Sequence, residues 1–163
     1  MCIRDRALLE IHGMHVGDAG ASALAAALGQ GALPRLETRD LYNAAIGDAG
    51  LVALAPALRR LPALESLFLS YNPLGDEGLA ALVAPPPPAG TPLLPTGGLK
   101  KLKELNLIYT QITDAGCATL AAALDSGALP ALVTLELHGI PASDAARDAV
   151  REALAKSRAA ALP

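Results

Sequence analysis

Residues that could perform catalysis are few in this chain and carry no recognisable catalytic motif. The chain has three histidines and two cysteines. Neither Cys2 nor Cys117 has a histidine or a second cysteine at the spacing of a metal site. The sequence also lacks a Gly-x-x-x-x-Gly-Lys phosphate loop, a His-Glu-x-x-His helix and a Gly-x-Ser-x-Gly elbow. We therefore expect no enzymatic activity, no metal and no cofactor.

The aromatic and acidic residues indicate binding chemistry instead. The chain has one Phe, three Tyr and no Trp, and exposed aromatics flanked by carboxylates are typical of the centres of protein-binding surfaces. The residues concerned are Tyr42, Phe68, Tyr71 and Tyr109, with Asp40, Glu104 and Glu136 among the acids. Whether they share one surface depends on the elements that carry them.

A repeated motif supplies those elements. The string Gly-Asp-Ala-Gly stands at residues 17–20 and 47–50, and variants of it recur further along the chain. The aspartates that anchor the copies are Asp18, Asp48, Asp76, Asp114 and Asp144, separated by 30, 28, 38 and 30 residues. A recurring period near 29 predicts a solenoid, in which each repeat buries its apolar face against its neighbours.

Each repeat combines a short strand with a helix. Before each anchor, leucines alternate with other residues at a period of two, as in Leu67 and Leu69, which indicates a strand with every second side chain inward. After each anchor the spacing becomes helical, as in Leu51, Leu54 and Leu58. We predict parallel strands near residues 8–11, 36–41, 65–69, 103–107 and 133–137, and helices that begin close to each anchoring aspartate.

With these motifs the chain resembles the leucine-rich-repeat family, in its ribonuclease-inhibitor-like branch, over about residues 8–154. The resemblance implies an α/β solenoid, a horseshoe arc of about five βα units with the parallel sheet on the concave face and helices on the convex face. It also implies a protein partner on the concave sheet. The family's turn asparagine occurs only as Asn72, with Met14, Ala44, Thr110 and Ile140 at the other four positions, so we expect those four turns to be looser.

The same motifs predict how the core and the helix starts are held. Leu67, Leu69, Leu74 and Leu79, with their copies in other repeats, are expected to meet between the two layers. Cys117 stands where two other repeats have leucine, so we expect a small core residue. We expect each anchoring aspartate to cap its own helix, and the glycine that ends each motif to mark close backbone approach.

The residues ten, eight, six and five positions before each anchor are predicted to face outward from the concave sheet. They are Leu8, Glu10, His12, Gly13; Thr38, Asp40, Tyr42, Asn43; Ser66, Phe68, Ser70, Tyr71; Glu104, Asn106, Ile108, Tyr109; and Thr134, Glu136, His138, Gly139. We predict a partner-binding site at Asp40, Tyr42, Phe68, Tyr71, Glu104, Ile108, Tyr109 and Glu136. The set contains acids but no Lys or Arg, which favours a basic partner. The alternative is that the tyrosines only pack along the ladder as cross-strand neighbours.

Three segments fall outside the regular pattern. Residues 1–6 resemble the translation of a sequencing-library adapter, so we expect the native domain at 7–163, with natural sequence lost upstream. Residues 85–98 are a proline-rich insert, interpreted as a flexible excursion or, alternatively, as a polyproline docking segment. Residues 143–158 are expected to form a polar C-terminal helix that could close the stack.

The composition limits the classes of partner and the cellular compartment that we expect. A net charge of −3 argues against nucleic acid, and no apolar run is long enough to cross a membrane. Because no signal peptide is evident, we expect a cytoplasmic protein. The favoured function is a non-enzymatic protein-interaction scaffold, part of a longer leucine-rich-repeat protein. Alternatives are the sensor array of a nucleotide-binding immune-type receptor, and a GTPase activator resembling the activator of the Ran GTPase, whose residues we leave unassigned.

Overall fold

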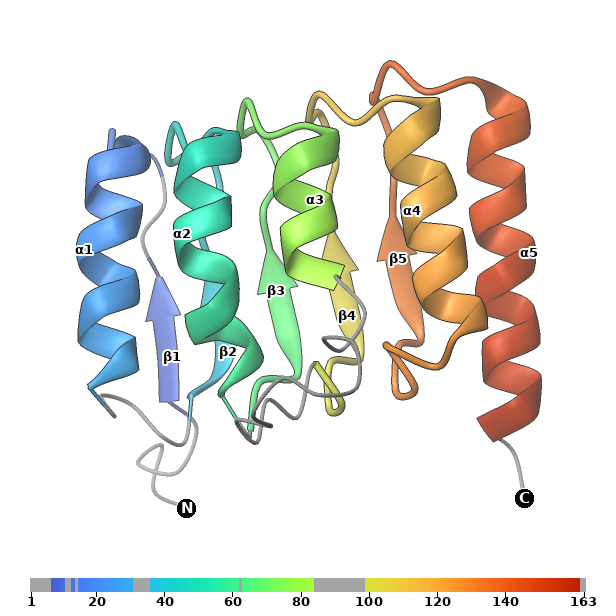
Figure 1. The fold of residues 1–163 in the computed structure, drawn as a ribbon, viewed down its shortest axis with the longest axis horizontal. Coiled ribbons are helices and arrows are strands. Elements are labelled where there is room, and N and C mark those ends of the chain that lie inside the picture. The colour runs from blue at the N-terminus through green and yellow to red at the C-terminus, as the bar shows by residue number, and fades with distance from the viewer. Residues whose placement is uncertain are drawn as a thin grey trace, which may run out of the picture.

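The computed structural model describes residues 7–10, 13, 15–30, 36–61, 63–83 and 99–161, with the backbone alone at residues 7–10, 36 and 161. The segment 1–6 and the insert 85–98 lie outside the described residues, as do His12 and Met14. Within the described part, strands and helices alternate along the chain in two layers (Figure 1).

The strands are β1 (Ala7–Glu10), β2 (Leu36–Asp40), β3 (Ser66–Phe68), β4 (Glu104–Asn106) and β5 (Thr134–Glu136), and the helices are α1 (Gly17–Gly29), α2 (Asp48–Arg59), α3 (Asp76–Val83), α4 (Asp114–Asp125) and α5 (Asp144–Ala161). The strands pair in parallel in the order β1-β2-β3-β4-β5, and the helices form a row over one face of that sheet (Figure 1). The predicted α/β solenoid of five βα units is thereby confirmed. We call the face opposite the helices the open sheet face.

The strand register follows the anchoring aspartates. Asp40 pairs with Phe68, Phe68 with Asn106, and Asn106 with Glu136. These four residues all stand eight positions before an anchor, so the predicted alignment of the repeats is correct. The strands β3 to β5 are one residue shorter at each end than predicted, and four of the five helices begin at their anchoring aspartate.

The core lies between the sheet and the helices. Leu67, Leu69, Leu74 and Leu79 are all 0% exposed, as predicted, and Cys117 is equally buried. Removing a leucine side chain from water contributes about 1.5–3 kcal/mol. Because each repeat supplies several such side chains, their burial holds the stack together without large aromatics.

The first four anchoring aspartates each cap the next helix, so the prediction that they cap their own helices is wrong. Oδ1 of Asp18, in α1, accepts the N–H groups of Gly47 (2.8 Å) and Gly50 (3.0 Å) at the start of α2. Oδ1 of Asp48 likewise accepts those of Gly75 (2.7 Å) and Gly78 (2.8 Å) at the start of α3. The N-terminal N–H groups of a helix have no partner within it, so the carboxylate of the preceding repeat satisfies them.

The glycine of the motif is required by this bridge. A Cβ atom on Gly50 would lie 2.5 Å from Oδ1 of Asp18, and one on Gly78 would lie 2.9 Å from Oδ1 of Asp48. A close approach is present at Gly50, Gly78 and Gly116, where the nearest atom is a carboxylate oxygen of the neighbouring aspartate, whereas at Gly20 the nearest atom belongs to the Val16 side chain.

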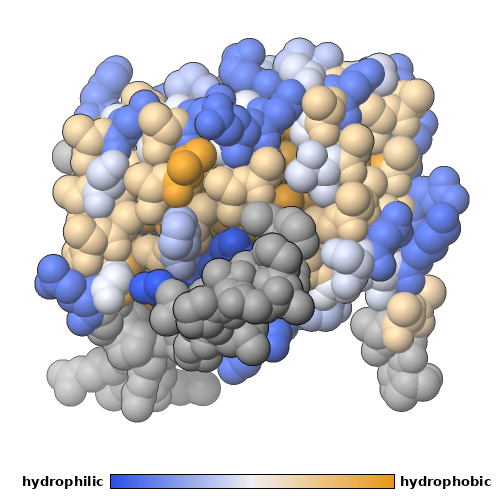
Figure 2. Space-filling model, in the orientation of Figure 1, coloured by the Kyte–Doolittle hydropathy of each residue, from blue (hydrophilic) through white to orange (hydrophobic). Residues whose placement is uncertain are grey.

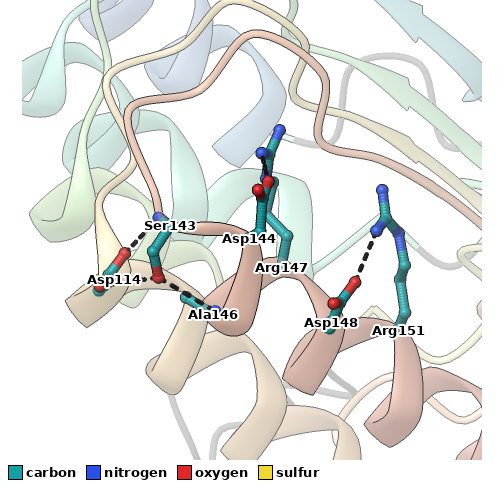
Figure 3. A network of polar contacts seen from close by, with 7 residues as sticks. All are labelled: Asp114, Ser143, Asp144, Ala146, Arg147, Asp148 and Arg151. Carbon is teal, nitrogen blue, oxygen red and sulfur yellow. Dashed lines mark hydrogen bonds and ion pairs between the residues drawn. The ribbon is translucent and has the colours of Figure 1, made fainter.

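The last repeat has Ala146 in place of this glycine and uses a serine instead. Asp114 accepts the N–H group of Ser143 at 2.6 Å and its hydroxyl at 3.0 Å, and the serine Oγ in turn accepts the N–H group of Ala146 at 3.2 Å (Figure 3). The serine hydroxyl thus lies between the carboxylate of Asp114 and the N–H group of Ala146, the third residue of α5. Because the carboxylate does not bond this N–H group directly, there is room for the alanine methyl. Beyond it, Asp148 and Arg151 pair along the surface of α5 at 2.8 Å.

Asn72 ties two repeats together at their turns. Its Oδ1 accepts the N–H groups of Ala44 (3.0 Å) and Ile46 (3.1 Å) in the preceding repeat, and its Nδ2 donates to the carbonyls of Leu41 (2.7 Å) and Leu69 (3.0 Å). Thr110 stands at the same position one repeat later, and its hydroxyl donates to one carbonyl, that of Leu107, at 2.8 Å. The expectation that turns without the asparagine are looser stays a prediction.

Arg39 departs from the core pattern. It pairs with Leu67 in the register and points inward, where the following repeats have leucine. Its side chain is 0% exposed, and Nε, Nη1 and Nη2 have no hydrogen-bond partner within the described part of the chain. Burial lowers its pKa from the ordinary arginine value to about 10, because the ionised form is disfavoured away from water.

Candidate protein-binding face

The open sheet face carries the side chains that point away from the helices. Because successive side chains of a strand point to opposite faces, the residues flanking each buried leucine emerge on this face. Its described side chains are Thr38, Asp40, Tyr42, Asn43, Ser66, Phe68, Ser70, Tyr71, Glu104, Asn106, Ile108, Tyr109, Thr134, Glu136 and His138. Leu8, Glu10 and His12 belong to the same predicted set, but their side chains lie outside the described residues.

Three tyrosines form a continuous row across this face. The ring centroids of Tyr42 and Tyr71 lie 5.0 Å apart at an interplanar angle of 57°, and those of Tyr71 and Tyr109 lie 4.8 Å apart at 36°. A Cβ atom built on Gly139 would lie 2.6 Å from the Tyr109 ring, so that ring covers the next turn. The rings contact one another along the ladder and still expose 41%, 45% and 52% of Tyr42, Tyr71 and Tyr109. We call Tyr42, Tyr71 and Tyr109 the tyrosine row.

Two of these tyrosines occupy a backbone conformation that suits glycine. The residue five positions before each anchor has positive φ in every repeat, as in Gly13 (66°), Asn43 (50°) and Gly139 (68°). At this position Tyr71 has φ of 59° and Tyr109 has φ of 54°. A side chain with a Cβ pays about 1–2 kcal/mol for this left-handed conformation. Gly and Asn at the equivalent positions were the sequence signal for it.

A shallow pocket of about 320 Å³ lies beside the tyrosine row. Of the predicted site residues, Asp40, Tyr42, Phe68, Tyr71 and Ile108 line it. Ser70 and Asn106 complete the lining; they share the outward register but are uncharged and non-aromatic, so the sequence did not single them out. Tyr109 adjoins Tyr71, whereas Glu104 and Glu136 are not among the pocket's lining residues.

The described part of the open sheet face carries negative charge. Asp40, Glu104 and Glu136 project from it, and no Lys or Arg lies among its described outward positions. Oδ1 of Asp40 accepts the N–H group of Tyr42 at 2.9 Å, which holds this carboxylate at the rim of the pocket. Lys103, at the start of β4, pairs with Glu65 at 3.2 Å.

The helix side of the molecule has a different character (Figure 2). Much of it is moderately apolar, with hydrophilic residues along one edge and over α5. Val52 on α2 is 39% exposed there, whereas the tyrosine row belongs to the open sheet face. The two sides can therefore be tested separately by substitution.

Among the described residues, the remaining chemically active side chains do not assemble a site. Burial raises the pKa of the Cys117 thiol, and the nearby carboxylates of Asp114 and Asp76 raise it further, so the reactive thiolate is disfavoured. Within the described ranges, no group of three or more His, Cys, Asp or Glu side chains could hold a metal ion. No helix in that same part of the chain combines the length and apolarity needed to span a membrane.

Known proteins share this sequence pattern. A family model described as "Leucine Rich repeat" matches residues 61–83 and 98–121. Ribonuclease inhibitor from Sus scrofa is 36% identical over 112 residues, covering 67% of this chain and 22% of that protein. Protein NLRC5 from Mus musculus is 38% identical over 143 residues, covering 74% of this chain and 7% of that protein. The chain thus spans less than a quarter of the length of either relative.

A solved structure agrees in fold. The chain titled Leiomodin-1 Actin-Binding Site 2 superposes with a TM-score of 0.66, covering 94% of this chain and 81% of that one, at 18% sequence identity. Identity this low supports a shared fold and no more. Taken with the motif repeats and the parallel βα stack, the sequence matches show that the chain belongs to the leucine-rich-repeat family, in its ribonuclease-inhibitor-like branch.

Proposed function

We propose that this protein is a non-enzymatic interaction scaffold that binds a basic protein partner on its open sheet face. The observation that carries the proposal is the tyrosine row, whose three rings contact one another and remain 41–52% exposed. Exposed aromatic side chains anchor many protein interfaces because they bury a large area with little loss of conformational freedom. The membership of a repeat family with ribonuclease inhibitor supports a binding role.

The backbone at Tyr71 and Tyr109 adds to this support. Both side chains accept a left-handed conformation that glycine or asparagine adopts in the other repeats. Backbone strain of this kind concentrates at functional sites, where something other than stability retains it. We interpret the two tyrosines as retained for a contact outside the chain.

Charge favours a basic partner. The described outward positions hold three carboxylates without a Lys or Arg among them. Such a field steers cationic proteins toward the face and chiefly raises the association rate. We also propose a cytoplasmic setting, which the free thiol of Cys117 supports, since structural disulfides mark oxidising compartments.

A second candidate is a sensor array within a larger receptor. The 38% identity with protein NLRC5 over 143 residues favours it. A sensor array also needs a binding face on these repeats. The two candidate functions therefore differ only in the role of the rest of the protein.

Partner capture with matched variants tests the proposal. The chain is immobilised, the captured proteins are identified, and capture is compared with that by Tyr71→Ala/Tyr109→Ala and by Asp40→Asn/Glu104→Gln. We expect the tyrosine variant to lose capture by about ten-fold or more and the charge variant to lose it mainly at low salt. Matched controls on the helix side are Val52→Ala and Glu77→Gln, both at exposed positions.

Retained capture by both open-face variants, with folding intact by circular dichroism, would refute the proposal. Loss of capture in Val52→Ala or Glu77→Gln would instead move the interface to the helices. A captured set without basic proteins would contradict the predicted charge preference.

A further inference from the structure

The pocket beside the tyrosine row is large enough to receive a single side chain. Its volume of about 320 Å³ stands at the lower limit of the range typical of ligand pockets. It lies where β2, β3 and β4 end, so residues of three adjacent repeats contribute to it. It therefore suits one protruding group of a bound protein.

The apolar lining of this pocket suits a cation as well as a hydrocarbon. Tyr42, Phe68 and Tyr71 contribute aromatic rings, and Ile108 contributes an aliphatic surface. The face of an aromatic ring attracts cations, most often guanidinium groups. Because the Tyr42 and Tyr71 rings already contact each other, with centroids 5.0 Å apart, binding would require little further ordering of these side chains.

The polar residues of the lining favour a ligand with positive charge. Among the described residues that line the pocket, Asp40 is the one that carries a charge, and its Oδ1 accepts the N–H group of Tyr42. A carboxylate keeps further acceptor positions when one is occupied. Ser70 adds a hydroxyl that can accept a second hydrogen bond.

We infer that this pocket binds the guanidinium group of an arginine side chain, a specific contact that rests on the proposed function for its protein partner. The planar guanidinium can stack on an aromatic ring while its N–H groups donate to a carboxylate. A lysine ammonium lacks the flat surface, and a carboxylate ligand would be repelled by Asp40. An apolar side chain would leave Asp40 without a counter-charge.

The test uses short peptides on the whole chain and needs no identified partner. Acetyl-Gly-Arg-Gly-amide is titrated into the ¹⁵N-labelled protein and compared with the same peptide carrying citrulline, which has the shape of arginine without its charge. We expect saturable shifts at the amides of Ser70, Asn106 and Ile108 with arginine, and binding about ten-fold or more weaker with citrulline. Acetyl-Gly-Lys-Gly-amide is expected to bind more weakly than the arginine peptide.

Matched variants locate the contact. Asp40→Asn removes the charge and keeps an oxygen for the Tyr42 N–H group, and it is expected to weaken the arginine peptide about ten-fold. Glu77→Gln removes a charge at an exposed position of α3, on the helix side and outside the pocket lining, and is expected to change binding less than about two-fold. The comparison of arginine with citrulline stands even if a variant fails to fold.

Equal binding of the arginine and citrulline peptides, or an unchanged affinity in Asp40→Asn, would overturn the inference. Loss of partner capture in Tyr71→Ala/Tyr109→Ala without arginine-selective shifts would also overturn it and leave the proposed function standing. Arginine-selective shifts together with partner capture that no open-face variant affects would refute the proposed function and uphold the pocket's selectivity.

Discussion

At the scale of single residues, the least favourable feature of the fold is the guanidinium of Arg39. It occupies a position that is leucine in the following repeats, is fully buried, and has no hydrogen-bond partner among the described residues. Burial lowers its pKa from the ordinary arginine value to about 10, a shift that corresponds to about 3 kcal/mol of lost stability. An unpaired buried charge commonly costs several kcal/mol, in agreement with this value.

Replacing this arginine should stabilise the protein. We expect Arg39→Leu to raise the free energy of unfolding by about 3 kcal/mol and the Tm by about 6–12 °C. Thermal and urea unfolding measure both quantities. Arg60→Leu, at an exposed position after α2, is the control and should change stability by less than about 0.5 kcal/mol. A stability of Arg39→Leu equal to or below that of the parent would show that the guanidinium has a partner.

We also expect the stability gained in Arg39→Leu to depend on pH. Because the folded-state pKa of Arg39, about 10, lies below the pKa of arginine in the unfolded chain, the unfolded chain binds the proton more tightly. The destabilisation is thus complete below pH 10 and disappears as the pH rises toward the pKa of the unfolded chain's arginine. The stability difference between Arg39→Leu and the parent should shrink across this window. A difference that stays constant from pH 9 to 11.5 would contradict the assigned cause.

A glycine and an alanine variant can measure the backbone strain at Tyr109. Both Tyr109→Gly and Tyr109→Ala remove the ring, and they differ mainly in how well they accept φ of 54°. We expect the glycine variant to be more stable than the alanine variant by about 1 kcal/mol. At Thr119, inside α4, the same comparison should favour alanine by about 1 kcal/mol. Equal stability of the two Tyr109 variants would mean that the turn relaxes.

At the scale of elements, the carboxylate bridges couple each helix to the next. Asp48 begins α2 and satisfies the first N–H groups of α3, so the start of one helix depends on a side chain of the previous repeat. The motif glycine leaves the space for this carboxylate. Stability of the helix layer is therefore shared between neighbouring repeats.

A double-mutant cycle on Asp48 and Gly78 measures this coupling. Gly78→Ala alone should destabilise the protein by about 1–3 kcal/mol, because its Cβ atom would lie 2.9 Å from Oδ1 of Asp48. In the Asp48→Ala background the carboxylate is absent, so the added methyl should cost at least about 1 kcal/mol less. Gly29→Ala, where the Cβ atom would meet nothing within 4 Å, is the control and should be neutral or stabilising. Additive effects at Asp48 and Gly78 would exclude a direct contact.

At the scale of the whole molecule, a stack of repeats is stabilised mainly by contacts between neighbours. In such arrays a defect in one repeat lowers stability locally before it affects distant repeats. In this protein the unfavourable group is the buried guanidinium of Arg39 in β2, two strands away from β4. The part of the stack around β2 should therefore open more readily than the part around α4.

Native-state hydrogen exchange measures this difference in local stability between the two parts of the stack. We expect amides of α1 and α2 to exchange with smaller opening free energies than those of α4. Arg39→Leu should raise the values for α1 and α2 more than the value for α4, whereas Arg60→Leu should alter none of them. Uniform protection along the chain, or an equal gain at α4, would indicate all-or-none opening of the whole stack.

The sequence by itself determined the repeat, the parallel βα order and the residues that leave the sheet on the open face. These features follow from local periodicity and from repetition, because each repeat packs against a near copy of itself and the anchors set the register. Asp40, Phe68 and Asn106 could thus be aligned without coordinates, and Asp40 pairs with Phe68 and Phe68 with Asn106.

Only the tertiary structure decided which atoms meet between repeats. It showed that Asp18 reaches Gly47 and Gly50, 29 and 32 residues away, instead of capping its own helix. It also revealed the isolation of Arg39. Such features depend on ångström distances between side chains of different repeats, and periodicity carries no information about those distances.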